Sequence, residues 1–312
     1  MSPHKAGAGR MPNFLVIGAG NAGTTSLYHY LDQHPEVFMS PVKEPKFFAL
    51  EGGLPDYQGP GDRWVMTQTS ANRAVADGEE YRALFRGVRG EKAVGEASPA
   101  YLCNPDAPKR IKRHVPEAKL IAVLRDPAER AYSAYMHQVR DGRETLPFAE
   151  ALDAEERRTA ANWAPGWQYT REGFYYGNLA RYFDLFGRDR IEIGLYEDLV
   201  LDPAGLMRGF FRFLGVDASF EPDTSRRHNP SGVPKSRLLM SVLKRPNPLR
   251  DAIKPLLPKG LRGRVSEGLQ THNLTKAPPL EPELRRRLVE LYREDVTRLE
   301  DLIGRDLSAW LR

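Results

Sequence analysis

Short hydrophobic runs alternate with stretches of helical periodicity along most of this chain. Each run is a strand candidate because it is apolar and is bounded by glycine or polar residues. The strand candidates are Phe14–Ile17, Val37–Met39, Ala93–Gly95, Leu120–Leu124 and Ile191–Leu195. Because helices are predicted between them, the pattern indicates an α/β fold with a parallel sheet covered on both faces. Ligands of such sheets bind at the carboxyl ends of the strands.

Helix signals follow several of these runs. One helix is predicted from Thr24 to the Gln33-His34-Pro35 stretch, where the proline stops it. Further helices are predicted from about Pro127, in the second half of the stretch 169–186, and from Pro203 to Leu214 before Gly215. A last helix is predicted near the end of the chain, with one apolar face formed by Leu284, Leu288, Leu291, Tyr292, Val296, Leu299 and Ile303.

Composition is that of a globular protein. The chain has 312 residues, of which 41% are hydrophobic and 28% charged. The single cysteine, Cys103, cannot form an internal disulfide, and no apolar run reaches the roughly 18–20 residues that span a bilayer. The first 12 residues lack the apolar core of a signal peptide, so we interpret 1–12 as a disordered leader and expect a cytoplasmic protein with one domain, 13–312.

The net charge of +5 is concentrated in one segment. Between Arg226 and Arg264 the chain has eleven Lys or Arg and a single acid, Asp251, whereas the rest carries 35 basic and 40 acidic residues. This pattern favours a local anionic ligand over a nucleic-acid-binding protein, which would be basic more widely. We interpret the proline-rich region near 226–276 as a basic lid or insertion and favour this over contact with an anionic membrane. Oligomeric state is left open.

A glycine-rich loop lies between the first strand and the first helix. It reads Gly18-Ala-Gly-Asn-Ala-Gly-Thr-Thr-Ser26. Glycines let the backbone wrap an anion, free N–H groups at a helix start point at it, and the hydroxyls of Thr24, Thr25 and Ser26 add donors. With the parallel sheet, the loop predicts a P-loop-like three-layer fold. A nucleoside-triphosphate loop has Lys after its last glycine, and here that residue is Thr24.

Four motifs in the same order resemble those of the PAPS-dependent sulfotransferase family, particularly its bacterial and heparan-sulfate-type branch. The family patterns are P-K-[AS]-G-T-T-S-L, K-E-P-x-F-F, G-E-x-S-P-x-Y and L-R-[ND]-P-x-x-R-A-Y-S. This chain has Gly20-Asn-Ala-Gly-Thr-Thr-Ser-Leu27, Lys43-Glu-Pro-Lys-Phe-Phe48, Gly95-Glu-Ala-Ser-Pro-Ala-Tyr101 and Leu124-Arg-Asp-Pro-Ala-Glu-Arg-Ala-Tyr-Ser133. Arg171-Glu-Gly-Phe-Tyr175, Tyr196-Glu-Asp-Leu199 and Phe213-Leu-Gly-Val216 are also similar to family segments. The resemblance covers nearly the whole chain from Phe14.

The resemblance implies an enzyme that moves a sulfuryl group from 3′-phosphoadenosine-5′-phosphosulfate (PAPS) to a hydroxyl or amine by in-line displacement. The implied donor-binding residues are Ala22, Gly23, Thr24, Thr25 and Ser26 for the 5′-phosphate, and Arg125 and Ser133 for the 3′-phosphate. The implied general base is Glu44, with Lys43 beside it. A glycan or a small molecule is the expected acceptor, and which one is left open.

Asn21 is where the chain departs from the family pattern, because the family has a lysine there that stabilises the 5′-phosphosulfate. We place Asn21 in the catalytic group and name Lys43, Lys46 and Lys109 as cations that could replace the missing charge. If none does, the chain is a slow enzyme or a non-catalytic member that binds a nucleotide or an anionic glycan. Another P-loop transferase, such as a small-molecule kinase, is a further alternative, which the absence of a loop lysine disfavours.

Other residues could act as the base if Glu44 does not. Glu96 is the first reserve, and its structural interpretation is a hydrogen-bond acceptor in a tight turn. His34 is interpreted as a cap or packing residue at a helix end, and His137 lies one turn beyond Ser133. The sequence has no group of His, Cys and acidic residues with metal-ligand spacing, and sulfuryl transfer calls for no metal, so no metal site is predicted.

Overall fold

A five-stranded sheet forms the centre of the protein, whose computed structural model describes residues 9–62, 74–225, 233–234, 274–275 and 277–312. The sheet strands are β1 (Phe14–Gly18), β2 (Val37–Met39), β3 (Ala93–Ala97), β4 (Lys119–Leu124) and β5 (Ile191–Leu195). Their order is β2-β3-β1-β4-β5, and every neighbouring pair is parallel. The predicted parallel sheet is confirmed, because strands buried on both faces are the near-continuous apolar runs of the sequence.

The strand order reverses at the β1–β4 pair. From β1 the chain moves outward to β2 on one side, and from β4 it moves outward to β5 on the other. Phe14 is paired with Gly95 of β3 and with Lys119 of β4, so β1 is the central strand. In open α/β sheets, ligands bind beyond the carboxyl ends of the strands at this switch point. The fold therefore points to the loop after β1 and the loop after β4.

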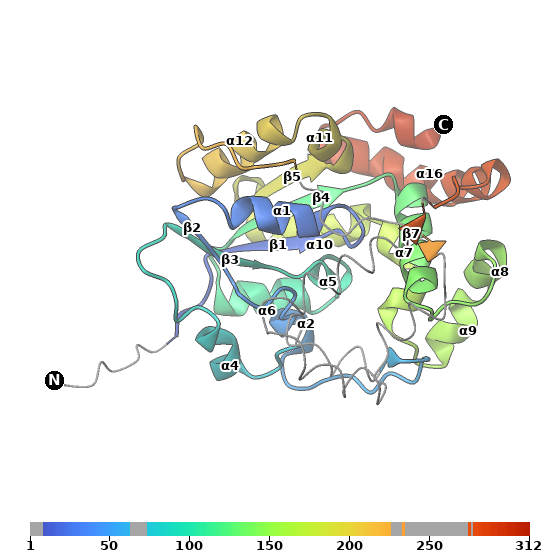
Figure 1. The fold of residues 1–312 in the computed structure, drawn as a ribbon, viewed down its shortest axis with the longest axis horizontal. Helices are drawn as coiled ribbons and strands as arrows, with labels where there is room; N and C mark the ends of the chain where they lie inside the picture. The colour runs from blue at the N-terminus through green and yellow to red at the C-terminus, as the bar shows by residue number, and fades with distance from the viewer. Residues whose placement is uncertain (1–8, 63–73, 226–232, 235–273, 276) are drawn as a thin grey trace.

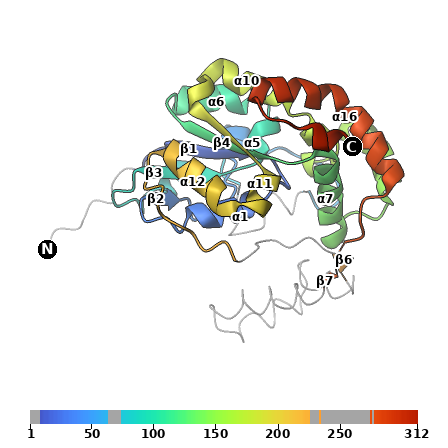
Figure 2. The same ribbon diagram turned by 90° about the horizontal axis from the view of Figure 1, so that it is seen from above.

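Helices cover both faces of the sheet, which gives the predicted three layers (Figure 1). One face carries α1 (Thr24–Leu31), α11 (Tyr196–Leu201) and α12 (Pro203–Leu214), and the other carries α5 (Ala100–Cys103), α6 (Ala107–His114) and α10 (Tyr176–Phe186), as seen from above in Figure 2. The short helices α2 (Phe47–Leu50) and α4 (Gly78–Ala83) complete the N-terminal half. Apolar residues of these layers enclose the strands in one continuous core.

A group of helices stands at the carboxyl end of the sheet. It comprises α7 (Pro127–Arg140), α8 (Phe148–Asp153), α9 (Glu155–Ala160) and the long α16 (Pro282–Ile303), which packs against α7 and α10. Single turns of 3₁₀-helix connect or end these elements: η1 (Pro165–Trp167), η2 (Arg171–Gly173), η3 (Arg188–Arg190) and η5 (Ser308–Leu311). The strands β6 (Val233–Pro234) and β7 (Leu274–Thr275) pair antiparallel, and β6 contacts α7.

The helices predicted from Thr24, Pro127, Pro203 and the C-terminal leucines are all present, but one predicted face is corrected. Leu288, Tyr292, Val296 and Leu299 of α16 are buried, whereas Leu291 is 47% exposed. Leu291 satisfies the helical spacing, yet it lies at the edge of the apolar stripe, where the next layer does not reach.

Two sequence predictions about whole segments fall partly outside the described residues. Of the predicted leader 1–12, residues 1–8 are not described, while Met11 packs against the core and Pro12 is buried, so the packed chain begins before residue 13. Most of the predicted basic lid near 226–276 also lies outside the described residues. Its described parts are the two short strands β6 and β7.

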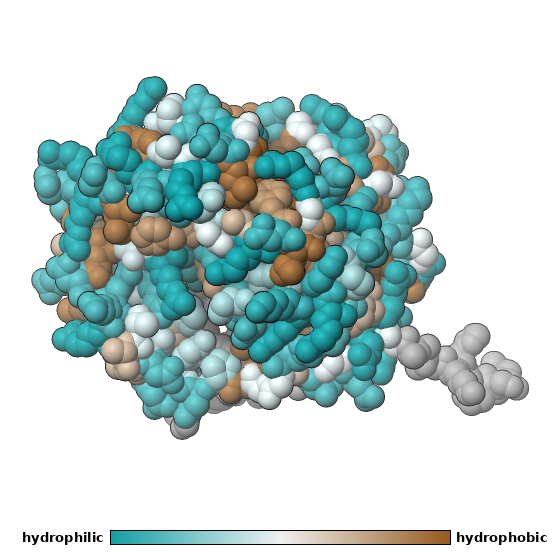
Figure 3. All heavy atoms as spheres, turned by 180° about the vertical axis from the view of Figure 1, so that it is seen from behind, coloured by the Kyte–Doolittle hydropathy of each residue, from teal (hydrophilic) through white to brown (hydrophobic). Residues whose placement is uncertain are grey.

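The surface is largely hydrophilic, with separate hydrophobic patches on the face seen in Figure 3. The described large apolar residues that are most exposed are Leu54, Leu185, Val200, Leu201 and Leu291. Among the described helices, none combines the length and the apolar character that a membrane span requires. The described residues also contain no cluster of three or more His, Cys, Asp or Glu side chains suited to hold a metal ion.

Candidate active site at the carboxyl edge of the sheet

The glycine-rich loop leads from β1 into α1 at the switch point. Asn21 and Gly23 have positive φ values of 64° and 84°, a left-handed conformation that glycine and asparagine adopt most readily. Gly23 is also required by close packing, because a Cβ there would lie 2.5 Å from Cδ2 of Leu199. No side chain caps the start of α1, so the backbone N–H groups of its first turn, beginning at Thr24, are left for an anion.

Arg125 directly follows β4 and reaches across to this loop. Its Nη1 donates a hydrogen bond to the backbone oxygen of Asn21 at 3.2 Å, and its guanidinium lies 4.6 Å from the ring centre of Tyr196. The Tyr175 hydroxyl donates to the Arg125 carbonyl at 2.9 Å, which fixes the backbone there. Glu129 is only a distant partner, 3.9 Å away. The two predicted phosphate-binding regions, 104 residues apart in sequence, are therefore in contact.

Helix α7 begins beside Arg125 and carries Ser133. The Asp126 side chain caps the helix by accepting from the N–H groups of Ala128 and Glu129, and it also pairs with Arg285 of α16 at 2.8 Å. Asp126 is thus occupied and does not neutralise Arg125. Ser133 is half-buried on α7, and within the described part of the chain its hydroxyl has no hydrogen bond. It lies one turn after Glu129, the residue of α7 that Arg125 approaches to 3.9 Å.

The predicted base, Glu44, lies between two lysines. Its Oε1 is 2.7 Å from Nζ of Lys43, its Oε2 is 3.4 Å from Nζ of Lys46, and its side chain is 24% exposed. Burial alone would raise the pKa of Glu44, but the charges of Lys46 and Lys43 outweigh burial and lower the pKa to about 2. The carboxylate is therefore ionised throughout the neutral range.

Backbone contacts to β3 hold this segment at the sheet edge. The N–H of Glu44 donates to the Ala97 carbonyl at 3.1 Å, and the N–H of Lys46 donates to Oγ of Ser98 at 3.0 Å. Glu44 and Lys46 both have left-handed backbones, with φ of 57° and 59°. Non-glycine residues adopt this conformation at an energetic cost, and such residues cluster at functional sites. The N–H of Ser98 donates to the Val16 carbonyl at 3.0 Å, so the segment is tied to β1, the strand that leads into the glycine-rich loop.

Glu96, the reserve base, is fully buried inside β3 and does not lie in a turn. It accepts hydrogen bonds from Tyr101 at 2.6 Å, Ser98 at 2.8 Å and Tyr81 at 3.2 Å. Burial raises the pKa of Glu96, the three hydroxyls lower it, and the charge of Glu44 raises it, with a net value of about 7. Its hydroxyl partners and lack of exposure fit the structural interpretation of Glu96 as an acceptor.

Sequence analysis gave no role to an ion pair that lies beside the loop. Arg130 of α7 is completely buried, and its Nη1 lies 3.3 Å from Oε2 of Glu172 in η2, while its Nη2 donates to the Tyr169 carbonyl. A Cβ added to Gly20 would lie 3.0 Å from that same Glu172 oxygen, so the carboxylate borders the loop. Both residues belong to motifs noted in the sequence, but residues 42 positions apart give no local signal of pairing.

The remaining candidates are separated from this group. His34 lies before β2, at the amino end of the strands. Its Nδ1 accepts a hydrogen bond from the N–H of Glu36, and its Nε2 lies 2.9 Å from the Asp217 carbonyl. These contacts support the packing role of His34. His137 contacts Arg140 within α7. Lys109 is exposed on α6.

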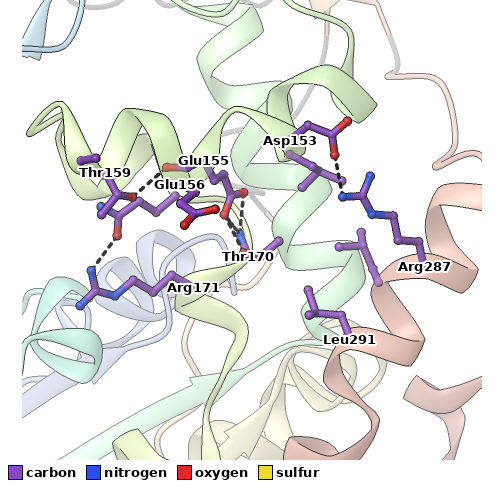
Figure 4. Close-up of a pocket in the computed structure, with 12 residues that line it drawn as sticks. Asp153, Glu155, Glu156, Thr159, Thr170, Arg171, Arg287 and Leu291 are labelled. Atoms are coloured by element: carbon purple, nitrogen blue, oxygen red, sulfur yellow. Dashed lines mark hydrogen bonds and ion pairs between the residues drawn. The ribbon is translucent and has the colours of Figure 1, made fainter.

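A separate cleft of about 780 Å³ opens between α8, α9 and α16 (Figure 4). Arg287 and Leu291 enter it from α16, and Arg287 pairs with Asp153 at 2.7 Å. Thr170 and Arg171 border it directly before Glu172. None of the catalytic or donor-binding residues predicted from the sequence lines this cleft, so we place the candidate active site at the sheet edge instead.

Comparison with known proteins identifies the family. Residues 12–222 match the model of the sulfotransferase family. A crystal structure of a sulfotransferase from Alicyclobacillus acidocaldarius is 37% identical, covers 97% of this chain and 99% of its own, and superposes with a TM-score of 0.76.

Curated relatives are larger proteins. A bifunctional heparan sulfate N-deacetylase/N-sulfotransferase 4 from Mus musculus is 28% identical over 97% of this chain, which spans 31% of that relative. A heparan sulfate glucosamine 3-O-sulfotransferase 3B1 from Mus musculus is 31% identical over 68% of this chain and 48% of its own length. The chain thus spans about a third to a half of these relatives. The family model covers more than half of the chain, and the solved structure nearly all of it: the chain belongs to the sulfotransferase family.

Proposed function

We propose that this chain transfers a sulfuryl group from PAPS to a hydroxyl or amine of a glycan or small-molecule acceptor. The contact between Arg125 and the Asn21 carbonyl carries this proposal, because it joins two anion-binding regions at the switch point of the sheet. A donor with phosphates at its 3′ and 5′ positions needs two such regions at a short distance. Relatives named for N-sulfation and 3-O-sulfation of heparan sulfate support a glycan acceptor.

Each region suits one phosphate. The N–H groups at the start of α1, with the hydroxyls of Thr24 and Thr25, are donors for the 5′-phosphate. Arg125 offers a guanidinium and Ser133 of α7 a hydroxyl for the 3′-phosphate. The Tyr196 ring under Arg125 orients the guanidinium without neutralising it.

The chemical step is a displacement at sulfur. The acceptor oxygen or nitrogen forms a bond to sulfur while the bond from sulfur to the bridging 5′-phosphate oxygen breaks, and that electron pair stays on the phosphate. Glu44 accepts the proton that the acceptor loses. The enzyme's contribution is to position both reactants and to neutralise the negative charge that grows on the leaving phosphate.

Binding of the desulfated donor, 3′-phosphoadenosine-5′-phosphate (PAP), tests the proposal. At about 100 times its dissociation constant, PAP should stabilise the folded protein by roughly 2.7 kcal/mol. In Arg125→Ala, PAP should bind about 1.5–3 kcal/mol more weakly, because one charge-assisted contact is lost. Thermal unfolding with and without each nucleotide measures both effects.

ATP is the matched control for the kinase alternative. A thermal shift with ATP and none with PAP would contradict the proposal and favour another P-loop transferase. Binding of PAP without sulfation of any phenol or glucosamine-containing acceptor would instead favour the non-catalytic alternative.

A further inference from the structure

The glycine-rich loop itself contains no cation, yet the reaction leaves a growing negative charge there. No Lys or Arg occurs between Gly18 and Ser26. Arg125 donates to the Asn21 carbonyl and is assigned above to the 3′-phosphate. In a water-poor site, a donor aimed at developing charge is one of the largest contributions to the rate. Some other cation is therefore needed on the acceptor side of the loop.

Lys43 and Lys46 are the cations beside the predicted base Glu44, but their surroundings differ. Lys43 makes a close contact of 2.7 Å with Glu44, whereas Nζ of Lys46 is 3.4 Å from the same carboxylate. Glu172 distinguishes them further: Lys46 is among the charges that lower its pKa against the effect of burial, and Lys43 is not among the main ones. Geometry also favours Lys46, because its N–H is bonded to Ser98 and the N–H of Ser98 donates to Val16 of β1, the strand that leads into the loop.

The backbone of Lys46 is held more firmly than its side chain. Its N–H donates to Oγ of Ser98, and Ser98 in turn donates to the buried Glu96. Lys46 precedes α2 in a left-handed conformation, and its side chain is 25% exposed. The ammonium is thus anchored near the loop and still has donors free for an anion, since a lysine has three.

We infer that Lys46 supplies the positive charge at the 5′-phosphate that the loop lacks, with Glu44 holding its ammonium until the donor binds. This assignment rests on the proposed function. It makes Lys46 a catalytic residue that contacts the leaving phosphate. It also explains how Asn21 is tolerated where the family has lysine: the charge comes from the neighbouring segment.

Nucleotide binding tests the contact without any acceptor. Lys46→Met should weaken binding of PAP about ten- to a hundredfold and leave binding of adenosine 3′-monophosphate, which lacks the 5′-phosphate, within about twofold. Lys46→Arg should retain most of the PAP affinity, and Lys109→Met, on the exposed face of α6, is the matched control. Equal losses for both nucleotides, or none for PAP, would overturn the inference.

Single-turnover sulfation at saturating PAPS tests the catalytic role. Lys46→Met should slow the step about 10²–10³-fold, and Asn21→Lys added to it should restore much of the rate, whereas Asn21→Lys alone should leave the rate flat or lower it. A Lys46→Met rate within threefold of the wild type would refute the inference while the proposed function stood. Failure of the wild-type protein to bind PAP would instead reject both.

Discussion

The segment that carries Glu44 and the interior of β3 that carries Glu96 shift the pKa of the same side chain in opposite directions. Glu44 is partly exposed between two lysines and has a pKa of about 2, whereas Glu96 is fully buried among three hydroxyls and has a pKa of about 7. The two segments are joined by Ser98, whose hydroxyl donates to Glu96 and accepts from the N–H of Lys46.

This difference shows how one edge of a sheet can hold a carboxylate suited to react beside another suited to a structural role. Charged neighbours keep Glu44 ionised and accessible, so it can meet an acceptor. Neutral hydroxyls donate hydrogen bonds to Glu96, but they do not compensate the energetic cost that burial imposes on its charged form. Glu96 therefore acts as a hydrogen-bond acceptor that fixes the segment carrying Glu44. A buried carboxylate with a raised pKa often marks a catalytic group. The three hydroxyl contacts of Glu96 favour a structural role instead.

The largest effect should come from Glu44. Glu44→Gln preserves shape and removes the proton acceptor, so the single-turnover rate should fall about 10²–10⁴-fold. PAP affinity is the control and should change little, because the loop and Arg125 are untouched. Near-normal turnover would break the comparison and move the base to Glu96, His34 or His137.

Glu96 should reveal itself in the pH dependence of stability. The folded protein holds a proton on Glu96 up to about pH 7, whereas the unfolded chain releases it near its ordinary value of 4.5. The stability that Glu96 contributes is therefore present below about pH 4.5 and is lost as the pH rises through 7, a change of about 3 kcal/mol.

Glu96→Gln should abolish this part of the pH dependence, as measured by urea unfolding at pH 4.5 and pH 8. The exposed Glu79 provides a control, because Glu79→Gln should follow the wild-type curve. Parallel curves for Glu96→Gln and the wild type would show that Glu96 is ionised in the folded protein.

The smallest effect is expected at Ser98, which joins the two segments. Ser98→Ala leaves the buried N–H of Lys46 without its acceptor and Glu96 without one donor, so unfolding should become easier by about 1–3 kcal/mol. The sulfation rate should fall as well, because Lys46 loses its anchor. Ser40→Ala removes a buried hydroxyl that bonds to the backbone of Val42, so it should lower stability and leave the rate unchanged. Equal sulfation rates for both variants would show that Ser98 does not anchor Lys46 for the reaction.

Much of the fold follows from local patterns. The runs Val37–Met39 and Ile191–Leu195 and the helix Pro203–Leu214 match the structure residue for residue. Short patterns were predicted less completely. The strand predicted at Ala93–Gly95 continues to Ala97, and the short helices α8 and α9 were not predicted. Leu291 shows the limit of periodicity, because spacing identifies a helix but not where its neighbours end.

The site was predictable only in part, for a similar reason. Motif order identified the loop, Arg125, Ser133 and Glu44 as candidates, and the structure brings the loop into contact with Arg125. The pairing of Arg130 with Glu172 joins α7 to η2, and a separation of this kind leaves no trace in a local pattern. The left-handed backbones at Glu44 and Lys46 could not be predicted either, because neither glutamate nor lysine favours a positive φ.

The two lysines beside Glu44 have a kinetic consequence. A carboxylate with a pKa of about 2 is a poor proton acceptor, since catalysis is most efficient when the pKa of the base is near the working pH. Bound phosphates would draw ammonium charge away from Glu44 and add negative charge nearby, and both effects raise its pKa. We therefore expect an ordered reaction in which the nucleotide enters first and the acceptor second. The free enzyme then cannot deprotonate an acceptor that arrives alone, and product nucleotide leaves last.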